Sequence, residues 1–354
     1  MRWAVGDDLG GRGVRVDPWL AHRGRTVTRR LPGLDALRGL AAAWVVVYHA
    51  TLRGLLPPTT LGLNGWMGVD LFFALSGYLL AVQHADRPPL VEWLARRARR
   101  LLPMHLVLLL GAGLPLWWMG RLDPLASTGP SSMGAFPSLR VLWSLAVEYH
   151  AYLLLPLVLR RRWRTLGLLA VVGLGPLARA YAVNEAAAAT GVFCRLDGLA
   201  WGALAAAWAP HQARAPWWTG VVLDAAAGGL LSVHVDMHAA GWSVPGFTVS
   251  GLVAALLVVE ASTWSTAPAW MRWLGRVSFS LYLLHEVVFD ALGGLLPVGV
   301  LLVGAVGVAG LAERFVERPF QRGGGGRAVA MGEPSSMRSP CALSLPPSSR
   351  SSAT

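Results

Sequence analysis

Two long runs without charged side chains limit what this chain can fold into. Leu101–Gly120 and Ala291–Ala312 contain no Asp, Glu, Lys or Arg over 20 or more positions. A helix of that length spans the roughly 30 Å hydrocarbon core of a bilayer. Apolar maxima recur along the chain about every 20–30 residues, with Gly and Pro between them. This spacing favours membrane-spanning helices and short loops over the alternating pattern of a membrane barrel.

The overall composition agrees with a membrane protein. Of the 354 residues, 54% are hydrophobic and only 14% are charged, whereas a soluble domain carries about 25% charged residues. We predict an all-α, polytopic transmembrane helical bundle with about ten spans. The predicted spans are 34–53, 66–83, 101–119, 141–159, 165–181, 195–209, 218–234, 247–262, 276–293 and 297–314.

Arginine placement predicts the topology. The largest arginine groups lie before residue 31, within 84–100 and in "RRRWR" at 160–164. With the N-terminus in the cytoplasm, these groups fall on the cytoplasmic side, so an even number of spans with both termini inside satisfies the positive-inside rule. Topology therefore explains the basic character, and we expect a lipid bilayer rather than nucleic acid as the partner.

Three regions are expected along the chain. Residues 1–30 form an Arg-rich cytoplasmic segment without the apolar core of a cleavable signal peptide. Residues 31–322 form the transmembrane domain. Residues 323–354 begin with "GGGG" and end with "SLPPSSRSSAT", a composition typical of a disordered cytoplasmic tail.

The stretch "LRGLAAAWVVVYHA" (37–50) places two polar side chains, Arg38 and His49, in an otherwise apolar span. Their eleven-residue separation is about 20° more than three helical turns, so both lie on one face about 16 Å apart. Ionisable side chains in a span normally face the bundle interior or a wet cavity. The alternative interpretation is that Arg38 reaches the inner headgroups and that His49 only bonds a neighbouring helix.

Other apolar stretches contain polar groups in the same manner. They are "GVDLFFALSGYLL", "RRARR", "WSLAVEYHAYLL", "SFSLYLLH" and "ERPF". Together with "LDALRGLAAAWVVVYHA", and in this order, they resemble the acyltransferase-3 family of bacterial multi-pass membrane O-acyltransferases. The resemblance covers about residues 34–320, nearly all of the predicted folded region.

The resemblance implies transfer of an acyl group, expected to be acetyl, from cytoplasmic acyl-CoA to a hydroxyl of a sugar or glycosylated acceptor. It also implies the inner (plasma) membrane of a bacterial cell, and acyl-CoA as a co-substrate rather than a tightly bound cofactor. Guanidinium groups suit phosphate oxygens. We therefore expect Arg38, Arg96, Arg97 and Arg100 to bind the donor, although the positive-inside rule alone would also place arginines there.

Transfer to a hydroxyl needs a base for the O–H proton, which typically contributes about 10²–10⁴-fold. His49 is the expected general base because imidazole titrates near neutral pH. Glu148 is the second expected catalytic residue, either orienting the imidazole or binding acceptor hydroxyls. Ser76 is a weaker candidate for an acyl-enzyme nucleophile.

Four further residues are expected at the acceptor side: Asp70, Arg195, Asp197 and His285. Each has a structural alternative. Asp70 could cap a helix, Arg195 and Asp197 could pair with each other, and His285 could serve packing alone. His234 and His238 are four residues apart, but no third ligand stands out, and we expect no metal site.

Two other functions remain open. Intramembrane carboxylates and histidines also occur in proton-coupled transporters, so an exporter of a saccharide or small molecule is the main alternative. A non-catalytic assembly partner with the same fold is the other. The sequence contains no repeat between its two halves of the kind found in many transporters, and the paired Arg38 and His49 favour an enzyme.

Overall fold

The computed structural model describes residues 31–84, 89–113, 141–160, 162–182, 185–212 and 243–322, together with a few isolated positions between these ranges. The predicted terminal segments, 1–30 and 323–354, lie outside the described residues. Within the described ranges every regular element is helical. The prediction of an all-α fold is confirmed for this part of the chain.

The longer helices follow the predicted spans closely. They are α1 (Pro32–Leu52), α3 (Met67–His84), α4 (Leu90–Leu108), α6 (Leu142–Leu159), α7 (Arg164–Ala180), α9 (Val192–Gln212), α11 (Ser243–Thr263), α12 (Ala269–Leu292) and α13 (Val298–Ala312). The short elements are α2 (Thr60–Leu63), η2 (Asn64–Trp66), η3 (Leu109–Gly113), α8 (Glu185–Thr190), η6 (Glu313–Glu317) and α14 (Arg318–Arg322).

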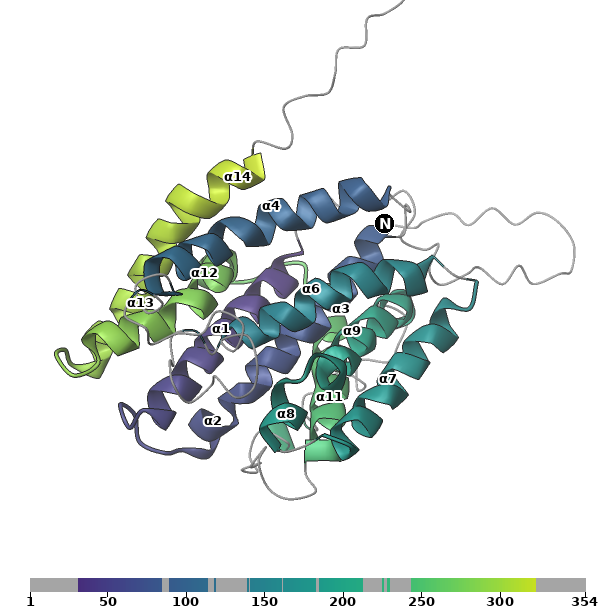
Figure 1. Ribbon diagram of the computed structural model, residues 1–354, viewed down its shortest axis with the longest axis horizontal. Helices are drawn as coiled ribbons and strands as arrows, with labels where there is room; N and C mark the ends of the chain where they lie inside the picture. The colour runs from purple at the N-terminus through teal and green to yellow at the C-terminus, as the bar shows by residue number, and fades with distance from the viewer. Residues whose placement is uncertain are drawn as a thin grey trace, which may run out of the picture.

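Two differences from the predicted spans stand out. α4 begins at Leu90 rather than near residue 101, so the "RRARR" cluster lies inside the helix and not before it. Basic and apolar residues in the first half of α4 lie on different faces of the helix, so one face can contact water. α4 crosses one end of the bundle beside α14 (Figure 1). The predicted span at 218–234 falls where the structure describes only isolated positions.

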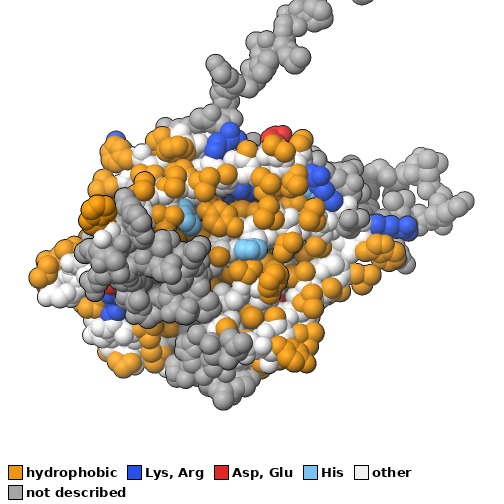
Figure 2. All heavy atoms as spheres, viewed as in Figure 1, with side chains coloured by type: hydrophobic (Ala, Val, Ile, Leu, Met, Phe, Trp, Pro, Cys, Tyr) orange, Lys and Arg blue, Asp and Glu red, His pale blue; other side chains and the backbone are white. Residues whose placement is uncertain are grey.

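Four stretches of helix in the described residues are long and apolar enough to cross a membrane: Thr60–His84, Leu142–Leu159, Ser243–Thr263 and Val298–Gln321. Hydrophobic side chains also cover most of the described surface on the face in Figure 2. Exposed apolar residues include Leu153, Leu166, Val303 and Leu311. A surface of this kind suits lipid contact rather than water.

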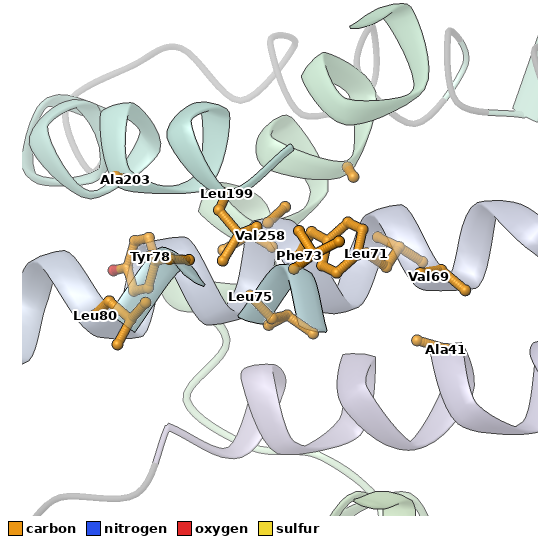
Figure 3. Close-up of a cluster of buried hydrophobic side chains, with 14 of the residues drawn as sticks. Ala41, Val69, Leu71, Phe73, Leu75, Tyr78, Leu80, Leu199, Ala203 and Val258 are labelled. Carbon is orange, nitrogen blue, oxygen red and sulfur yellow. The ribbon is translucent and has the colours of Figure 1, made fainter. Parts of the chain in front are cut away.

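The core lies where α3 passes between α1 on one side and α9 and α11 on the other. Figure 3 shows Phe73 and Leu75 of α3 between Ala41 of α1 and Leu199 of α9. A methyl group built on Gly77 would meet the Leu199 carbonyl oxygen at 1.9 Å. Such close backbone approach is how small residues join membrane helices.

α1 and α12 run parallel to each other. Gly39 contacts the backbone of Gly275, and further along the pair His49 contacts His285. Parallel neighbours require an odd number of membrane crossings between them, which the predicted ten-span arrangement provides. α13 packs on α12 and runs back in the opposite direction. The start of α1 and the end of α14 therefore lie at the same end of the bundle.

Candidate functional site

His49 lies near the end of α1, where it contacts two consecutive residues of α12. Its Nδ1 atom is 2.9 Å from Nε2 of His285, and its Nε2 atom is 3.4 Å from Oε1 of Glu286. The other ring nitrogen of His285, Nδ1, lies 3.0 Å from the main-chain oxygen of Leu281, one turn earlier. The structure thus brings together His49 and His285, two of the residues predicted from sequence.

Two further charged residues complete this group, which we call the His49 cluster: His49, Arg53, His285, Glu286 and Asp290. Arg53 forms ion pairs with Glu286 and, at 2.6 Å, with Asp290. Glu286 and His285 are fully buried, whereas the His49 side chain keeps 15% of its surface exposed. His49 is therefore more accessible to a substrate than the two residues that hold it.

Glu148 lies in a separate place, in the middle of α6. Its Oε1 atom accepts hydrogen bonds from the hydroxyls of Ser76, at 3.1 Å, and Tyr152. The carboxylate lines a cavity of about 50 Å³ together with Arg38, Arg100 and other side chains. The predicted catalytic pair is thus divided between this cavity and the His49 cluster, where His285 and Glu286 of α12 contact the His49 ring.

Tyr282 connects the two places. It lines the Glu148 cavity, its hydroxyl is 2.7 Å from that of Ser144, and its ring centroid is 6.2 Å from that of His285. Tyr282 and His285 are one helical turn apart on α12, so Tyr282 lies between the wall of the Glu148 cavity and the imidazole pair.

A second cavity, of about 210 Å³, opens at the end of the bundle where α1 and α12 begin. It shares four lining residues with the Glu148 cavity: Arg38, Arg100, Ser278 and Phe279. Arg276 adds a third guanidinium to its wall. We call this second cavity the arginine vestibule, and its shared wall makes it the approach to Glu148 and Tyr282.

The vestibule also contains acidic residues, but most of these have protein partners. Glu313 pairs with Arg318 at 2.7 Å, and Glu317 accepts a hydrogen bond from Ser280. Arg38 is 3.9 Å from Asp35. Among the described residues, Arg100 and Arg276 form no hydrogen bond or ion pair, although Glu317 of the same cavity lies close enough to interact electrostatically with Arg100.

The other two predicted donor-binding arginines lie elsewhere on α4. Arg96 is partly exposed and forms an ion pair with Glu92, one turn earlier. Arg97 is buried, donates a hydrogen bond to Gln83, and stacks 4.7 Å from the ring of Trp93. Neither Arg96 nor Arg97 lines the arginine vestibule.

Three predicted acceptor residues lie in a buried ion-pair network between α3, α7, α9 and α11. Arg195 pairs with Asp70, and Asp197 pairs with Arg179 at 2.9 Å. Arg195 also stacks 3.8 Å from the Phe247 ring centroid. Arg195 and Asp197 therefore pair with other residues and not with each other. Asp70 is the fourth residue of α3, and its carboxylate binds Arg195 instead of capping the helix.

Sequence reasoning gave no role to several residues of the two sites: Arg53, Glu286, Asp290, Arg276 and Tyr282. The spacing along the sequence could have indicated three of them: Arg53, Glu286 and Asp290. Arg53 is four residues after His49, and Asp290 is four residues after Glu286, so each lies on the same helix face as its neighbour. The pairing of α1 with α12 that joins these faces is a tertiary contact, which spacing alone does not provide.

One group of side chains has the composition of a metal site. His49, His285 and Glu286 place ligand atoms within 4.8 Å of one another. Arg53 binds the same carboxylate, and the two imidazole nitrogens face each other at hydrogen-bond distance. A mutual hydrogen bond accounts for this geometry without an ion. His234 and His238 lie outside the described residues.

The helical fold and its long apolar helices are those of a membrane protein. Residues 31–312 match the acyltransferase domain of the acyltransferase-3 family. The chain belongs to this family, as its motifs indicated.

The curated relatives of this chain carry the names of O-acetyltransferases. A Staphylococcus aureus (strain COL) protein named "Putative O-acetyltransferase" is 27% identical over 365 residues, covering 84% of this chain and 58% of its own length. The O-acetyltransferase OatA of S. aureus (strain NCTC 8325 / PS 47) is 26% identical over 358 residues with the same coverage. The chain thus spans a little under three fifths of the length of these relatives. No solved structure matches the chain.

Proposed function

We propose that this protein is a membrane O-acetyltransferase that moves an acetyl group from cytoplasmic acetyl-CoA to a hydroxyl of a carbohydrate or glycosylated acceptor. Family membership implies an acyl donor and a hydroxyl acceptor. The observation that carries the finer proposal is the wall shared by the arginine vestibule and the Glu148 cavity, together with Tyr282, which lines that cavity and lies one turn before His285, the partner of His49.

The donor enters from the vestibule end of the bundle. Coenzyme A is a polyanion, and Arg38, Arg100 and Arg276 present guanidinium groups to the vestibule. Guanidinium groups bind phosphate oxygens with charge-assisted hydrogen bonds. The narrow, extended pantetheine arm would run from the vestibule past Ser278 and Tyr282, and the smaller cavity, at about 50 Å³, must widen to admit it. The positive-inside rule supports a cytoplasmic position for this end, in the plasma membrane of a bacterium.

His49 is the proposed general base. The acceptor oxygen attacks the thioester carbonyl carbon, and the carbon–sulfur bond breaks. The proton of the hydroxyl passes to His49 Nε2 and then to the sulfur, so that coenzyme A leaves as the free thiol. Glu286, at 3.4 Å from Nε2, stabilises the imidazolium that forms between these two proton transfers.

Because Glu148 lies away from His49, we do not assign it the task of orienting the imidazole; its proposed role is to bind the donor. Hydrogen bonds from Ser76 and Tyr152 hold its carboxylate in the cavity wall, where the amide groups of the pantetheine arm pass. Its carboxylate accepts a hydrogen bond from such an amide and so positions the thioester. Direct transfer is proposed, with Ser76 serving to orient Glu148.

The test uses purified protein in sealed liposomes of bacterial lipid, with radiolabelled acetyl-CoA supplied on one side and an oligosaccharide acceptor on either side. The proposal expects release of free CoA thiol in proportion to acetyl ester formed on the acceptor. Passage of labelled saccharide across the bilayer without ester or thiol formation would contradict it and favour the transporter alternative.

A further inference from the structure

The tautomer of His49 is set by a chain of three groups that begins at a main-chain carbonyl. The Leu281 oxygen can only accept a hydrogen bond, so the Nδ1 atom of His285, at 3.0 Å, must carry a proton. A neutral imidazole has one N–H group, which leaves Nε2 of His285 as an acceptor.

The second link follows from the 2.9 Å contact between the rings. With Nε2 of His285 as acceptor, the hydrogen in this contact must belong to Nδ1 of His49. The remaining nitrogen of a neutral His49, Nε2, then carries the lone pair. This atom lies 3.4 Å from Oε1 of Glu286, so a proton taken up at Nε2 turns a contact between two acceptors into an ion pair.

We propose that His285 is a positioning residue that fixes His49 as the Nδ1–H tautomer, so that Nε2 is the basic nitrogen in acetyl transfer. This inference rests on the proposed function. It replaces the predicted contact of His285 with the acceptor, because a fully buried ring bonded to Leu281 and His49 has both nitrogens engaged. The arrangement gives a second imidazole the orienting task that a carboxylate performs in many catalytic triads.

The chain contains a matched control for this geometry. Nδ1 of His150 lies 2.7 Å from the Ala146 oxygen, the same one-turn contact that His285 makes with Leu281. His150 is exposed on α6 and belongs to neither cavity nor the His49 cluster. Replacing His150 therefore removes an imidazole and the same local bond without touching the tautomer of His49.

The first experiment compares acetyl transfer by the wild type, H285A, H285Q and H150A, all in liposomes and at matched amounts of monodisperse protein. We expect H285A to lose about 10³-fold in kcat with little change in the KM for acetyl-CoA, comparable to other losses of a tautomer-setting partner. In H285Q the amide oxygen replaces Nε2 as acceptor, so we expect a kcat about tenfold higher than that of H285A. H150A should match the wild type.

Three results would overturn the proposal: an H285A variant that transfers acetyl at the wild-type rate, a loss confined to KM, or H285Q no better than H285A while both remain monodisperse. Loss of wild-type activity on chelation and its return with Zn²⁺ would also overturn it, because a metal and not a hydrogen bond would then join the two rings.

A second measurement needs no turnover, and so separates this inference from the proposed function. In protein labelled with ¹⁵N-histidine and reconstituted in lipid, the His49 signal is assigned by its absence from a His49→Gln sample. We expect a protonated Nδ1 and an unprotonated Nε2 in the wild type, and a mixture of tautomers in H285A. A wild-type His49 protonated on Nε2 alone would refute the inference even if the enzyme is active.

Discussion

The Nε2 atom of His49 lies 3.4 Å from a carboxylate oxygen of Glu286. Glu286 is fully buried, and its charge is paired with that of Arg53, the residue that follows the last turn of α1, the helix that carries His49. A buried carboxylate that is fixed before the reaction stabilises developing positive charge without reorganising. This relationship makes Glu286 the neighbour whose charge matters most for proton transfer to His49.

Glu286→Gln keeps the shape of the side chain and removes its charge. We expect kcat to fall about 10²-fold, in the range found for loss of one preorganised electrostatic partner, with little change in either KM. Steady-state kinetics with acetyl-CoA and a soluble oligosaccharide measure this. Glu260→Gln, on α11 and outside the site, is the control and should keep the wild-type rate. Equal rates for the two variants would remove Glu286 from the mechanism.

Arg100→Gln and Arg276→Gln should each weaken donor binding. Both guanidinium groups line the arginine vestibule, and a charge-assisted hydrogen bond to phosphate is worth about 1.5–3 kcal/mol, or roughly 10–100-fold in KM for acetyl-CoA. kcat should change little. Initial-rate measurements over a range of acetyl-CoA concentration provide the values.

Arg96→Gln and Arg272→Gln are the comparison variants for this prediction. Arg96 pairs with Glu92 away from the vestibule, and Arg272 is exposed near the start of α12. An Arg96→Gln effect as large as that of Arg100→Gln would favour the sequence-based expectation that the whole "RRARR" cluster binds the donor. An equal effect of Arg272→Gln would indicate nonspecific charge attraction.

Asp70→Asn is expected to destabilise the fold. It leaves Arg195 as a buried charge without its carboxylate partner, a change that costs about 3–5 kcal/mol in buried ion pairs. Adding Arg195→Gln should cost less than the sum of the single changes, because the two groups interact directly. Thermal unfolding followed by tryptophan fluorescence in detergent tests this. A raised acceptor KM with unchanged thermal stability would instead restore the predicted acceptor role of Asp70.

Gly275→Ala is expected to disturb the packing of α1 on α12. A methyl group built at this position meets the Asp35 carbonyl oxygen at 1.9 Å, so the helices must separate. Because the same pair of helices carries His49 and His285, we expect lower stability and at least about tenfold lower kcat. Gly304→Ala on α13 adds the same methyl group where nothing lies within 4 Å, and should leave both quantities unchanged.

Sequence periodicity predicted most of the described helices because apolar runs and Gly or Pro breaks are local features. α1, α6 and α11 lie within a few residues of their predicted ranges. The start of α4 was harder to predict from the sequence. Its arginines resemble a loop when hydropathy alone is considered, although their helical spacing leaves one face free to contact water.

Site residues were predictable where one helix carries them. The shared face of Arg38 and His49 follows from helical geometry, and the structure places Arg38 at the vestibule and His49 beside His285. The roles of Glu286 and Arg276 depend on which face of α12 meets α1, and this depends on the contact between Gly39 and Gly275. The partners of Asp70 and Asp197 come from different helices, Arg195 on α9 and Arg179 on α7, so only the tertiary structure identifies them.

The most direct test of the account measures transfer of radiolabelled acetyl from acetyl-CoA in membranes, comparing wild type, His49→Ala and His150→Ala at matched expression. The account predicts ester formation by the wild type and His150→Ala, and a rate lower by about 10²–10⁴-fold in His49→Ala. A His49→Ala rate close to that of the wild type would contradict the assignment of His49 as the general base.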